Sequence, residues 1–239
     1  MKTSFTKFFI TLIMNLIISV PIYAEVVEQK DLHFPVKTEE LLKGNIHYFY
    51  KILSPRKLAV QYPEILELDS LSLSQKEKIA FIVTKAVTVV NRPVGFFEEK
   101  QMSEEKFLSH TLGTSKVIKS DENKFQVDFR DFSYKMNLFF DADDVSTSPK
   151  KVIKAVTAAK KLDVISQSAS TIMFTEKTHF TKFMEGGASV SSFVPVKENK
   201  TLIITYQLYA ITKKQKSPAL KENFVGEIEA LKALIQTYK

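Results

Sequence analysis

The stretch Thr201–Thr212, TLIITYQLYAIT, decides the predicted fold, because it has the features of a central β-strand. It is rich in β-branched and aromatic residues, which strands favour, and near its start it is apolar on both faces. The preceding segment, 188–196, is a second strand candidate, and the polar tetrapeptide Lys197-Glu198-Asn199-Lys200 joins the two. These segments therefore predict a β-hairpin.

An amphipathic helix is predicted to follow this hairpin and to close the chain. Ser217-Pro218 supplies an N-cap and a proline for the first helical turn. The residues that form one apolar stripe at helical spacing are Leu220, Phe224, Ile228, Leu231 and Ile235. The residues expected to face outward are Glu222, Glu227, Glu229, Lys232 and Gln236. We therefore expect an α+β fold in which an antiparallel sheet packs against the C-terminal helix.

Further strands are predicted where apolar and polar residues alternate. The clearest is Asn45–Leu53, NIHYFYKIL, which places Ile46, Tyr48, Tyr50 and Ile52 on one face. Ser54-Pro55 should turn the chain into a return strand. The remaining expected strands are 57–62, 125–129, 132–140, 170–176 and 179–184.

The N-terminal portion is predicted to be mainly helical. The tetrapeptide Ser74-Gln75-Lys76-Glu77 resembles a capping box, and the apolar residues behind it recur at helical spacing up to Pro93. The residues of that apolar face are Ile79, Ile82, Val83, Ala86, Val87 and Val90. Shorter helices are expected to begin at Thr38, Ser103 and Ser148, and residues 25–37 are expected to be poorly ordered.

Residues 1–24, MKTSFTKFFITLIMNLIISVPIYA, are typical of a secretory signal peptide. Lys2 and Lys7 precede an apolar run from Phe8 to Val20, and Ala24 offers a small residue at the expected cleavage point. The apolar run is shorter than the ~20 residues that span a bilayer, so we expect cleavage and no transmembrane segment in the mature chain. The sequence thus predicts an exported protein, periplasmic or secreted, with one α+β domain over 25–239 and an N-terminal subregion over 38–119.

Composition excludes several classes of function. The chain has no cysteine, which rules out disulfides, thiolate catalysis and a cysteine-linked lipid anchor. The net charge of +7 comes from lysine far more than arginine, because the only arginines are Arg56, Arg92 and Arg130. Nucleic-acid readers depend on the bidentate guanidinium group, so we expect no nucleic-acid partner. An anionic envelope surface is a partner that the lysines would fit.

No motif of an established catalytic, cofactor or metal site is present, and we expect a non-enzymatic protein without a cofactor. Glycine-rich phosphate loops and paired metal-ligand histidines are absent from the sequence. Gly187-Ala188-Ser189-Val190-Ser191 falls short of a nucleophile elbow, because Ser191 replaces its last glycine. A hydrolase would need dispersed groups to converge, with His47, His179, Asp141 and Ser189 as the candidates.

Aromatic residues are abundant, with 19 phenylalanines and 8 tyrosines, and most of the expected strands carry several. Their ordinary role is to fill the core. Their functional alternative is to line a pocket between the sheet and the C-terminal helix that accepts an apolar ligand. The candidates for this lining are Tyr48, Tyr134, Phe140, Phe183, Tyr206 and Phe224.

The order of strands, long hairpin and closing amphipathic helix over residues 125–239 resembles the helix-grip architecture of START-type lipid-binding domains. The segments that carry the resemblance are TLIITYQLYAIT and NFVGEIEALKALIQ. The resemblance implies a cavity for a lipid or another hydrophobic molecule, and it transfers no functional residue. The chain also resembles uncharacterised exported bacterial proteins of similar length.

Two main hypotheses follow from the sequence. The first is an exported, non-enzymatic protein that binds a hydrophobic small molecule or a cell-envelope component. The second is an envelope structural or interaction protein without a ligand cavity, which an exposed apolar patch would favour. An exported hydrolase with a dispersed site is a third alternative.

Overall fold

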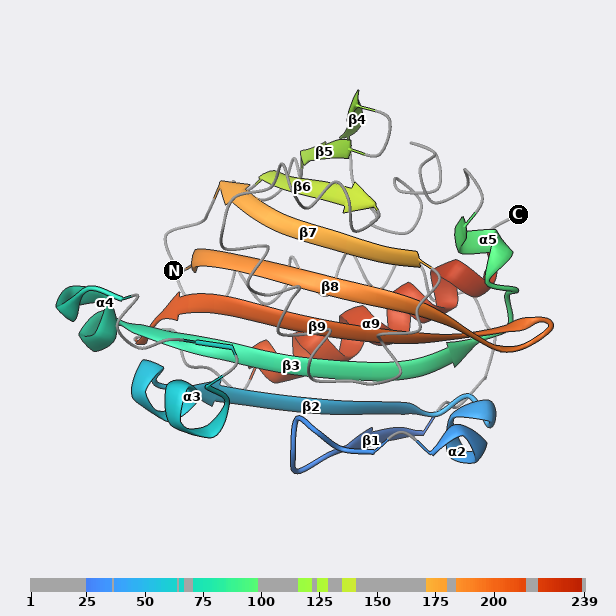
Figure 1. Cartoon of the computed structure of the whole chain (residues 1–239), viewed down its shortest axis with the longest axis horizontal. Coiled ribbons are helices and arrows are strands. Elements are labelled where there is room, and N and C mark those ends of the chain that lie inside the picture. Colours follow the sequence, from blue (N-terminus) through green and yellow to red (C-terminus); the bar gives the residue numbers. More distant parts are fainter. Residues whose placement is uncertain are drawn as a thin grey trace.

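A computed structural model describes residues 25–35, 37–63, 65–66, 71–98, 116–121, 124–128, 135–140, 171–179, 184–213 and 219–237. These residues contain a nine-stranded sheet of order β1-β2-β3-β9-β8-β7-β6-β5-β4 (Figure 1). Its strands are β1 (Val26–Glu28), β2 (Ile46–Leu53), β3 (Ile79–Val90), β4 (Lys116–Asp121), β5 (Lys124–Asp128), β6 (Lys135–Phe140), β7 (Thr171–His179), β8 (Met184–Lys197) and β9 (Lys200–Thr212).

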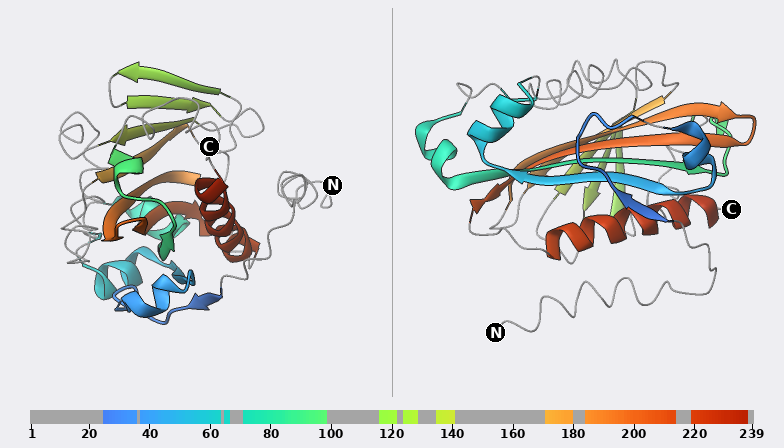
Figure 2. Two further views of the ribbon diagram at one scale, coloured as in Figure 1. Left: turned by 90° about the vertical axis from the view of Figure 1, so that its right-hand side faces the viewer. Right: turned by 90° about the horizontal axis from the view of Figure 1, so that it is seen from below.

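The sheet is mixed rather than purely antiparallel, because β1 runs parallel to β2 while the other neighbouring strands are antiparallel. Only α9 is a long helix among the described residues, and it lies across one face of the sheet (Figure 2). The described helices are α2 (Thr38–Leu42), α3 (Pro55–Gln61), α4 (Leu73–Lys78), α5 (Gly95–Glu98) and α9 (Ala219–Thr237).

The predicted hairpin and C-terminal helix are confirmed. β8 and β9 pair in register around Lys197 and Lys200, and α9 follows them. The predicted strands at 45–53, 125–129, 132–140 and 170–176 correspond to β2, β5, β6 and β7. Strand β4 corresponds to none of the predicted strands. The predicted strand at 179–184 lies mostly outside the described residues, and so do the predicted helices beginning at Ser103 and Ser148.

The helix predicted behind residue 77 is wrong, because Ile79–Val90 forms strand β3. All twelve of its residues are buried, with β2 on one side and β9 on the other. A strand that is buried on both faces is apolar nearly throughout, and a continuous apolar run also satisfies helical spacing. The many β-branched residues of IAFIVTKAVTVV decide for the strand. The N-terminal portion is therefore not mainly helical, since it contributes strands to the sheet.

Two local predictions nearby are also corrected. The capping box exists, but it begins two residues earlier: Ser72 Oγ accepts a hydrogen bond from Gln75 N, and Gln75 Oε1 accepts one from Ser72 N. The short helix that it starts ends at Lys78. The expected return strand at 57–62 is helix α3 instead, because Ser54 acts as an N-cap and Pro55 occupies the first turn.

The lead-in at 25–37 is ordered rather than loose over the part that the structure describes. β1 pairs with β2, and Leu32 and Phe34 are buried in the core. Lys85 of β3 fixes this segment, because its buried Nζ donates to the Phe34 carbonyl at 3.3 Å and lies 4.3 Å from the Phe34 ring centroid. Helix α2 follows at Thr38, although its N-cap is Lys37 and not Thr38.

The two faces of the sheet are packed differently. Alternation in β2 is as predicted: Phe49 and Leu53 face a core formed with the lead-in, α3, Tyr62 and Leu66. Tyr48 and Tyr50 face α9 instead. Directly paired residues of neighbouring strands share a face, so the register assigns each residue of β3, β9 and β8 to one side or the other.

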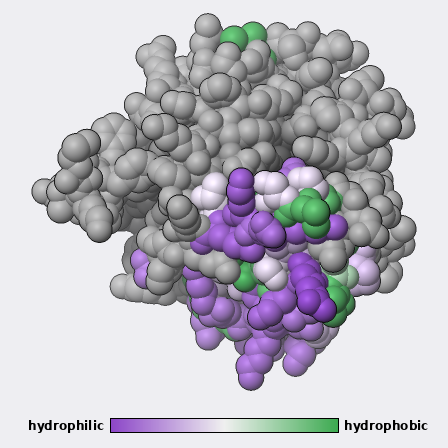
Figure 3. Space-filling model, turned by 90° about the vertical axis from the view of Figure 1, so that its left-hand side faces the viewer, coloured by the Kyte–Doolittle hydropathy of each residue, from purple (hydrophilic) through white to green (hydrophobic). Residues whose placement is uncertain are grey.

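The described residues on the face seen from the α3 and α4 end of the sheet are mostly hydrophilic, with a few apolar patches (Figure 3). Two apolar residues on these helices are exposed: Val60 at 75% and Leu73 at 80%. Both stand singly on short helices, and scattered exposed residues of this kind are common on soluble surfaces.

Lys232 of α9 is buried, with 6% of its surface exposed, and the prediction that it faces outward is wrong. Its Nζ donates to the Gly44 carbonyl in the turn between α2 and β2. Gly44 has φ of 90°, in the left-handed region where a glycine is favoured. Burial lowers the pKa of Lys232 to about 8.

The buried Lys232 should make stability depend on pH. Because its pKa is lowered in the folded state, the unfolded chain binds more protons between pH 8 and 10.5, and stability should rise with pH across that window. The gain should be at most roughly 1 kcal/mol per pH unit. Urea unfolding of the wild type and Lys232→Met at pH 8, 9 and 10 should show this rise in the wild type relative to the variant. Lys43→Met, an exposed lysine beside the same turn, is the control and should track the wild type. Parallel pH profiles for wild type and Lys232→Met would contradict the prediction.

Candidate functional site

The structure separates the aromatic residues that the sequence suggested for one pocket. Tyr48 and Phe224 lie together between β2 and α9, with ring centroids 6.3 Å apart. Tyr206 lies on the opposite face of the sheet, where it packs with the core around Phe49. Phe140 belongs to β6, where it pairs with Met173 of β7. Tyr134 and Phe183 lie outside the described residues.

Two apolar clusters attach α9 to the sheet. The first contains Phe224, Val225 and Ile228 of the helix, packed against strands β1 to β3. The second lies nearer the start of the helix and contains Leu220. The sheet residues of the first cluster are Val26, Tyr48, Tyr50 and Ala86, and those of the second are Tyr50, Ile52, Ala80, Ile82, Tyr209 and Ile211. Tyr50 belongs to both clusters and therefore marks the line between them.

A row of polar residues crosses the sheet along this line, and we call it the polar row. Tyr50 of β2 pairs with Thr84 of β3, Thr84 pairs with Gln207 of β9, and Gln207 pairs with Ser189 of β8. Because directly paired residues share a face, all four side chains are on the α9 side of the sheet. The face of a sheet beneath an amphipathic helix is ordinarily apolar, so four successive polar residues there are unusual.

Hydrogen bonds satisfy part of this row. Thr84 is 1% exposed, and its Oγ1 donates to Gln207 Oε1 at 3.3 Å. The next row along the strands adds Ser191 and Thr205, whose hydroxyls are 2.8 Å apart. Tyr50, Gln207 and Ser189 are half-buried, which places them at the boundary between the covered sheet and solvent.

Tyr50 is the unusual member of the polar row. Its Oη is buried and has no hydrogen-bond partner among the described residues. Its ring lies 5.7 Å from that of Phe224 of α9. Burial raises the pKa of Tyr50 to about 12, because the charged phenolate is disfavoured away from water. At neutral pH the group is therefore a protonated donor, and a buried donor without an acceptor costs free energy.

Polar contacts fasten both ends of α9. Near its start, Lys221 forms an ion pair with Glu28 of β1 at 2.5 Å, and Tyr48 Oη donates to the same carboxylate at 3.4 Å. At its end, Arg92 donates through Nε to the Ile235 carbonyl at 3.2 Å and through its second terminal nitrogen to the Gln236 carbonyl at 3.1 Å. These carbonyls have no partner within the helix, so Arg92 acts as a C-cap.

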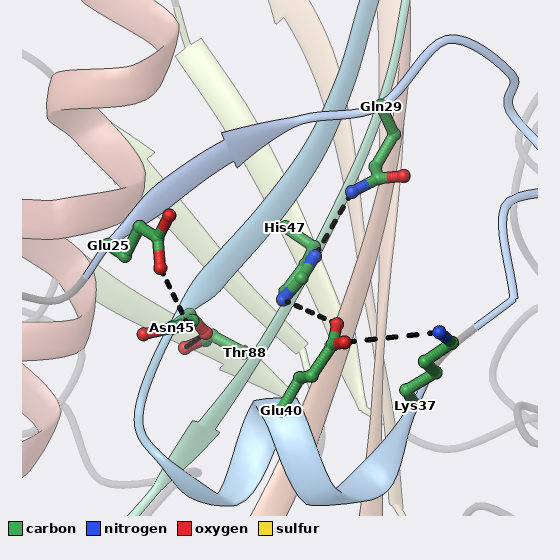
Figure 4. Close-up of polar contacts among 7 residues, drawn as sticks. All are labelled: Glu25, Gln29, Lys37, Glu40, Asn45, His47 and Thr88. Atoms are coloured by element: carbon green, nitrogen blue, oxygen red, sulfur yellow. Dashed lines mark hydrogen bonds and ion pairs between the residues drawn. The ribbon is translucent and has the colours of Figure 1, made fainter.

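His47, a candidate hydrolase residue, lies in a polar cluster at the β1 edge of the sheet (Figure 4). Gln29 Nε2 donates to His47 Nδ1 at 3.1 Å, and His47 Nε2 is 4.0 Å from Glu40 Oε2. The register places His47 on the face opposite α9 and Ser189 on the α9 face. These two groups therefore do not converge. Asp141 lies outside the described residues, and His179 ends β7.

The described residues contain no group of three or more acidic or histidine side chains placed to hold a metal ion. Among the described helices, none combines the length and apolar character needed to cross a bilayer.

The sequence contains the polar row but does not reveal it. Thr205 and Gln207 interrupt one face of TLIITYQLYAIT, and Ser189 and Ser191 do the same in the neighbouring strand. Only the register shows that these residues line up with each other and with Tyr50. The alternation within each strand is visible in the sequence, but the pairing between the strands is not.

Comparison with known proteins finds solved structures of similar shape. No family model and no curated protein matches the sequence. Norcoclaurine synthase from Thalictrum flavum, in complex with dopamine and hydroxybenzaldehyde, is 11% identical, with 73% of this chain and 97% of that chain covered and a TM-score of 0.42. The Mll3558 protein from Rhizobium loti is 8% identical over 65% and 98% of the two chains, with a TM-score of 0.41.

A START superfamily protein from Mycobacterium smegmatis is 10% identical, with 64% of this chain and 94% of that chain covered and a TM-score of 0.38. These likenesses, one of them to a START superfamily protein, are structural resemblances at low sequence identity. What these proteins bind is not transferred to this chain, whose function has to follow from its own residues.

Replacing Tyr50 by phenylalanine should test its unpartnered hydroxyl in the ligand-free protein. Removing a buried donor that makes no hydrogen bond should keep or raise the free energy of unfolding, by about 1 kcal/mol. Tyr48→Phe is the matched control, because its hydroxyl donates to Glu28, and it should lose up to about 1 kcal/mol. Urea unfolding followed by circular dichroism measures both. A clear loss of stability in Tyr50→Phe would show that its hydroxyl has a structural partner.

Proposed function

We propose that this protein binds a hydrophobic small molecule on the α9 side of its sheet, without catalysing a reaction. The observation that carries the proposal is the polar row, which lies between two apolar clusters beneath α9. Apolar walls with a few placed polar groups are the usual lining of a small-molecule site. The half-buried side chains of Tyr50, Gln207 and Ser189 would then contact the ligand.

The alternative of a structural or interaction protein rests on Val60 and Leu73, the exposed apolar residues on α3 and α4. They are single exposed side chains on two different short helices, whereas interaction sites usually form a contiguous patch. The hydrolase alternative loses support from the positions of His47 and Ser189 on opposite faces. Ligand binding is therefore the function that the described residues favour.

Binding of the solvatochromic dye Nile red tests the proposal. Thr205 and Leu208 are half-buried neighbours on β9 that face opposite sides of the sheet, with Thr205 on the α9 side. Phenylalanine at residue 205 should obstruct the ligand and raise the dissociation constant about tenfold, since overpacking costs ~1–3 kcal/mol. Leu208→Phe is the control and should bind the dye like the wild type.

Circular dichroism would first establish that both variants are folded. Saturable dye binding that Thr205→Phe weakens and Leu208→Phe does not would support the proposal. The absence of saturable binding by the wild type would overturn it, and equal effects of the two variants would place the dye elsewhere on the protein.

Export is part of the same proposal and rests on the signal-like sequence of residues 1–24. The described fold is compatible with cleavage after Ala24, because its first pairing contact uses the Glu25 carbonyl, which accepts a hydrogen bond from Ile46 N. Expression of the full chain in a bacterium should therefore give an exported protein whose N-terminal residue is Glu25. Cell fractionation and N-terminal sequencing measure this outcome. A cytoplasmic protein that retains Met1 would contradict export and leave the binding proposal standing.

A further inference from the structure

The polar row contains groups that specify what kind of polar atom a ligand should carry. Tyr50 Oη is a buried hydroxyl without a partner among the described residues. Gln207 uses its Oε1 to accept from Thr84, and its Nε2 carries two N–H donors. Both groups are donors on the same row and the same face of the sheet. A ligand that satisfies them must present an acceptor oxygen.

The charge of that acceptor follows from the side chains around it. The polar row consists of tyrosine, threonine, glutamine and serine, so it holds no cation. The described lysines of α9 are engaged elsewhere: Lys221 pairs with Glu28, and Lys232 donates to the Gly44 carbonyl. A carboxylate brought beside Tyr50 would lose its hydration without gaining a counter-ion, which is costly in a buried site. An uncharged oxygen would gain hydrogen bonds at a much smaller desolvation cost.

We infer that the ligand is a neutral amphipathic molecule, with an apolar body and a hydroxyl, ketone or ester oxygen that accepts hydrogen bonds from Tyr50 and Gln207. This inference rests on the proposed binding function and names the chemical class of its ligand. The apolar body would contact the two clusters on either side of the row, which contain Phe224 and Leu220 of α9. The elevated pKa of Tyr50 agrees with this assignment, since it keeps the phenol protonated as a donor at every pH from 5 to about 10.

Competition against bound Nile red tests the class of ligand directly. The competitors are dodecanol, methyl dodecanoate and sodium dodecanoate, which share a chain length and differ in the polar group. At pH 8 the acid is ionised. We expect the alcohol and the ester to displace the dye at concentrations about tenfold lower than the carboxylate does, because only the carboxylate must bury a charge.

The variant Tyr50→Phe tests whether the Tyr50 hydroxyl donates a hydrogen bond to the ligand. The variant should bind Nile red, and dodecanol should compete with the dye about 3- to 10-fold less well than it does in the wild type, which is the usual worth of one hydrogen bond. Tyr62→Phe is the matched control, because Tyr62 is a buried tyrosine on the opposite face, in contact with Phe49. This control should leave all three competition curves unchanged.

The outcomes separate the two proposals. If the dye binds but the carboxylate competes as well as the alcohol, or Tyr50→Phe leaves the alcohol unaffected, the inference about the ligand is overturned and the binding function stands. If the wild type does not bind the dye saturably, the proposed binding function is wrong, and the inferred class of ligand is wrong as well. A smaller effect in Tyr50→Phe than in Tyr62→Phe would likewise overturn the role of Tyr50.

Discussion

The burial of β3 on both of its faces is the constraint on which the rest of the structure depends. Each of its twelve residues is buried, and it pairs with β9 along its whole length and with β2 from Phe81 to Val87. One face meets the core that holds Phe49, Val83 and Leu58, and the other meets α9. Neither the N-terminal segments nor the C-terminal hairpin could bury β3 alone, so both regions join it in one sheet. The position of every residue beneath α9 then follows from the register with β3.

That register is what places the four polar residues of the polar row side by side on one face of the sheet. Polar residues are costly beneath a helix unless their hydrogen bonds are made, and Thr84 with Gln207 meets this requirement in part. The Tyr50 hydroxyl does not. A phenylalanine at the same place would keep the ring contact with Phe224 and avoid the cost. Residues that lower the stability of the fold are common at functional sites, where binding takes precedence over stability.

Sequence reasoning located the hairpin and the closing helix because their patterns extend over many residues and agree with local propensity. It failed for Ile79–Val90 because a strand buried on both faces leaves no alternation, so helical spacing is matched by default. It also failed for Lys232, which occupies a polar position of the helical pattern. Nothing in that pattern indicates that the lysine donates to the Gly44 carbonyl. Among the predicted site residues, Tyr48 and Phe224 meet, whereas Tyr206 packs on the other face. The face of the sheet that a strand residue occupies depends on how the strands pair. That pairing joins residues more than a hundred positions apart in the sequence, as with Thr84 and Gln207.

The attachment of α9 at its ends has a consequence for the polar row, which lies level with Leu220 and Phe224 of the helix. Lys221 with Glu28 holds the start of the helix, and Arg92 holds its last carbonyls. None of these contacts uses a side chain of the polar row, so the helix stays over the sheet without requiring an apolar partner at every position. The row is then free to carry residues chosen for their hydrogen bonding. Because the Tyr50 hydroxyl is buried between the two apolar clusters, one hydrogen bond to it would discriminate more strongly between neutral and charged oxygens than it would on an open surface.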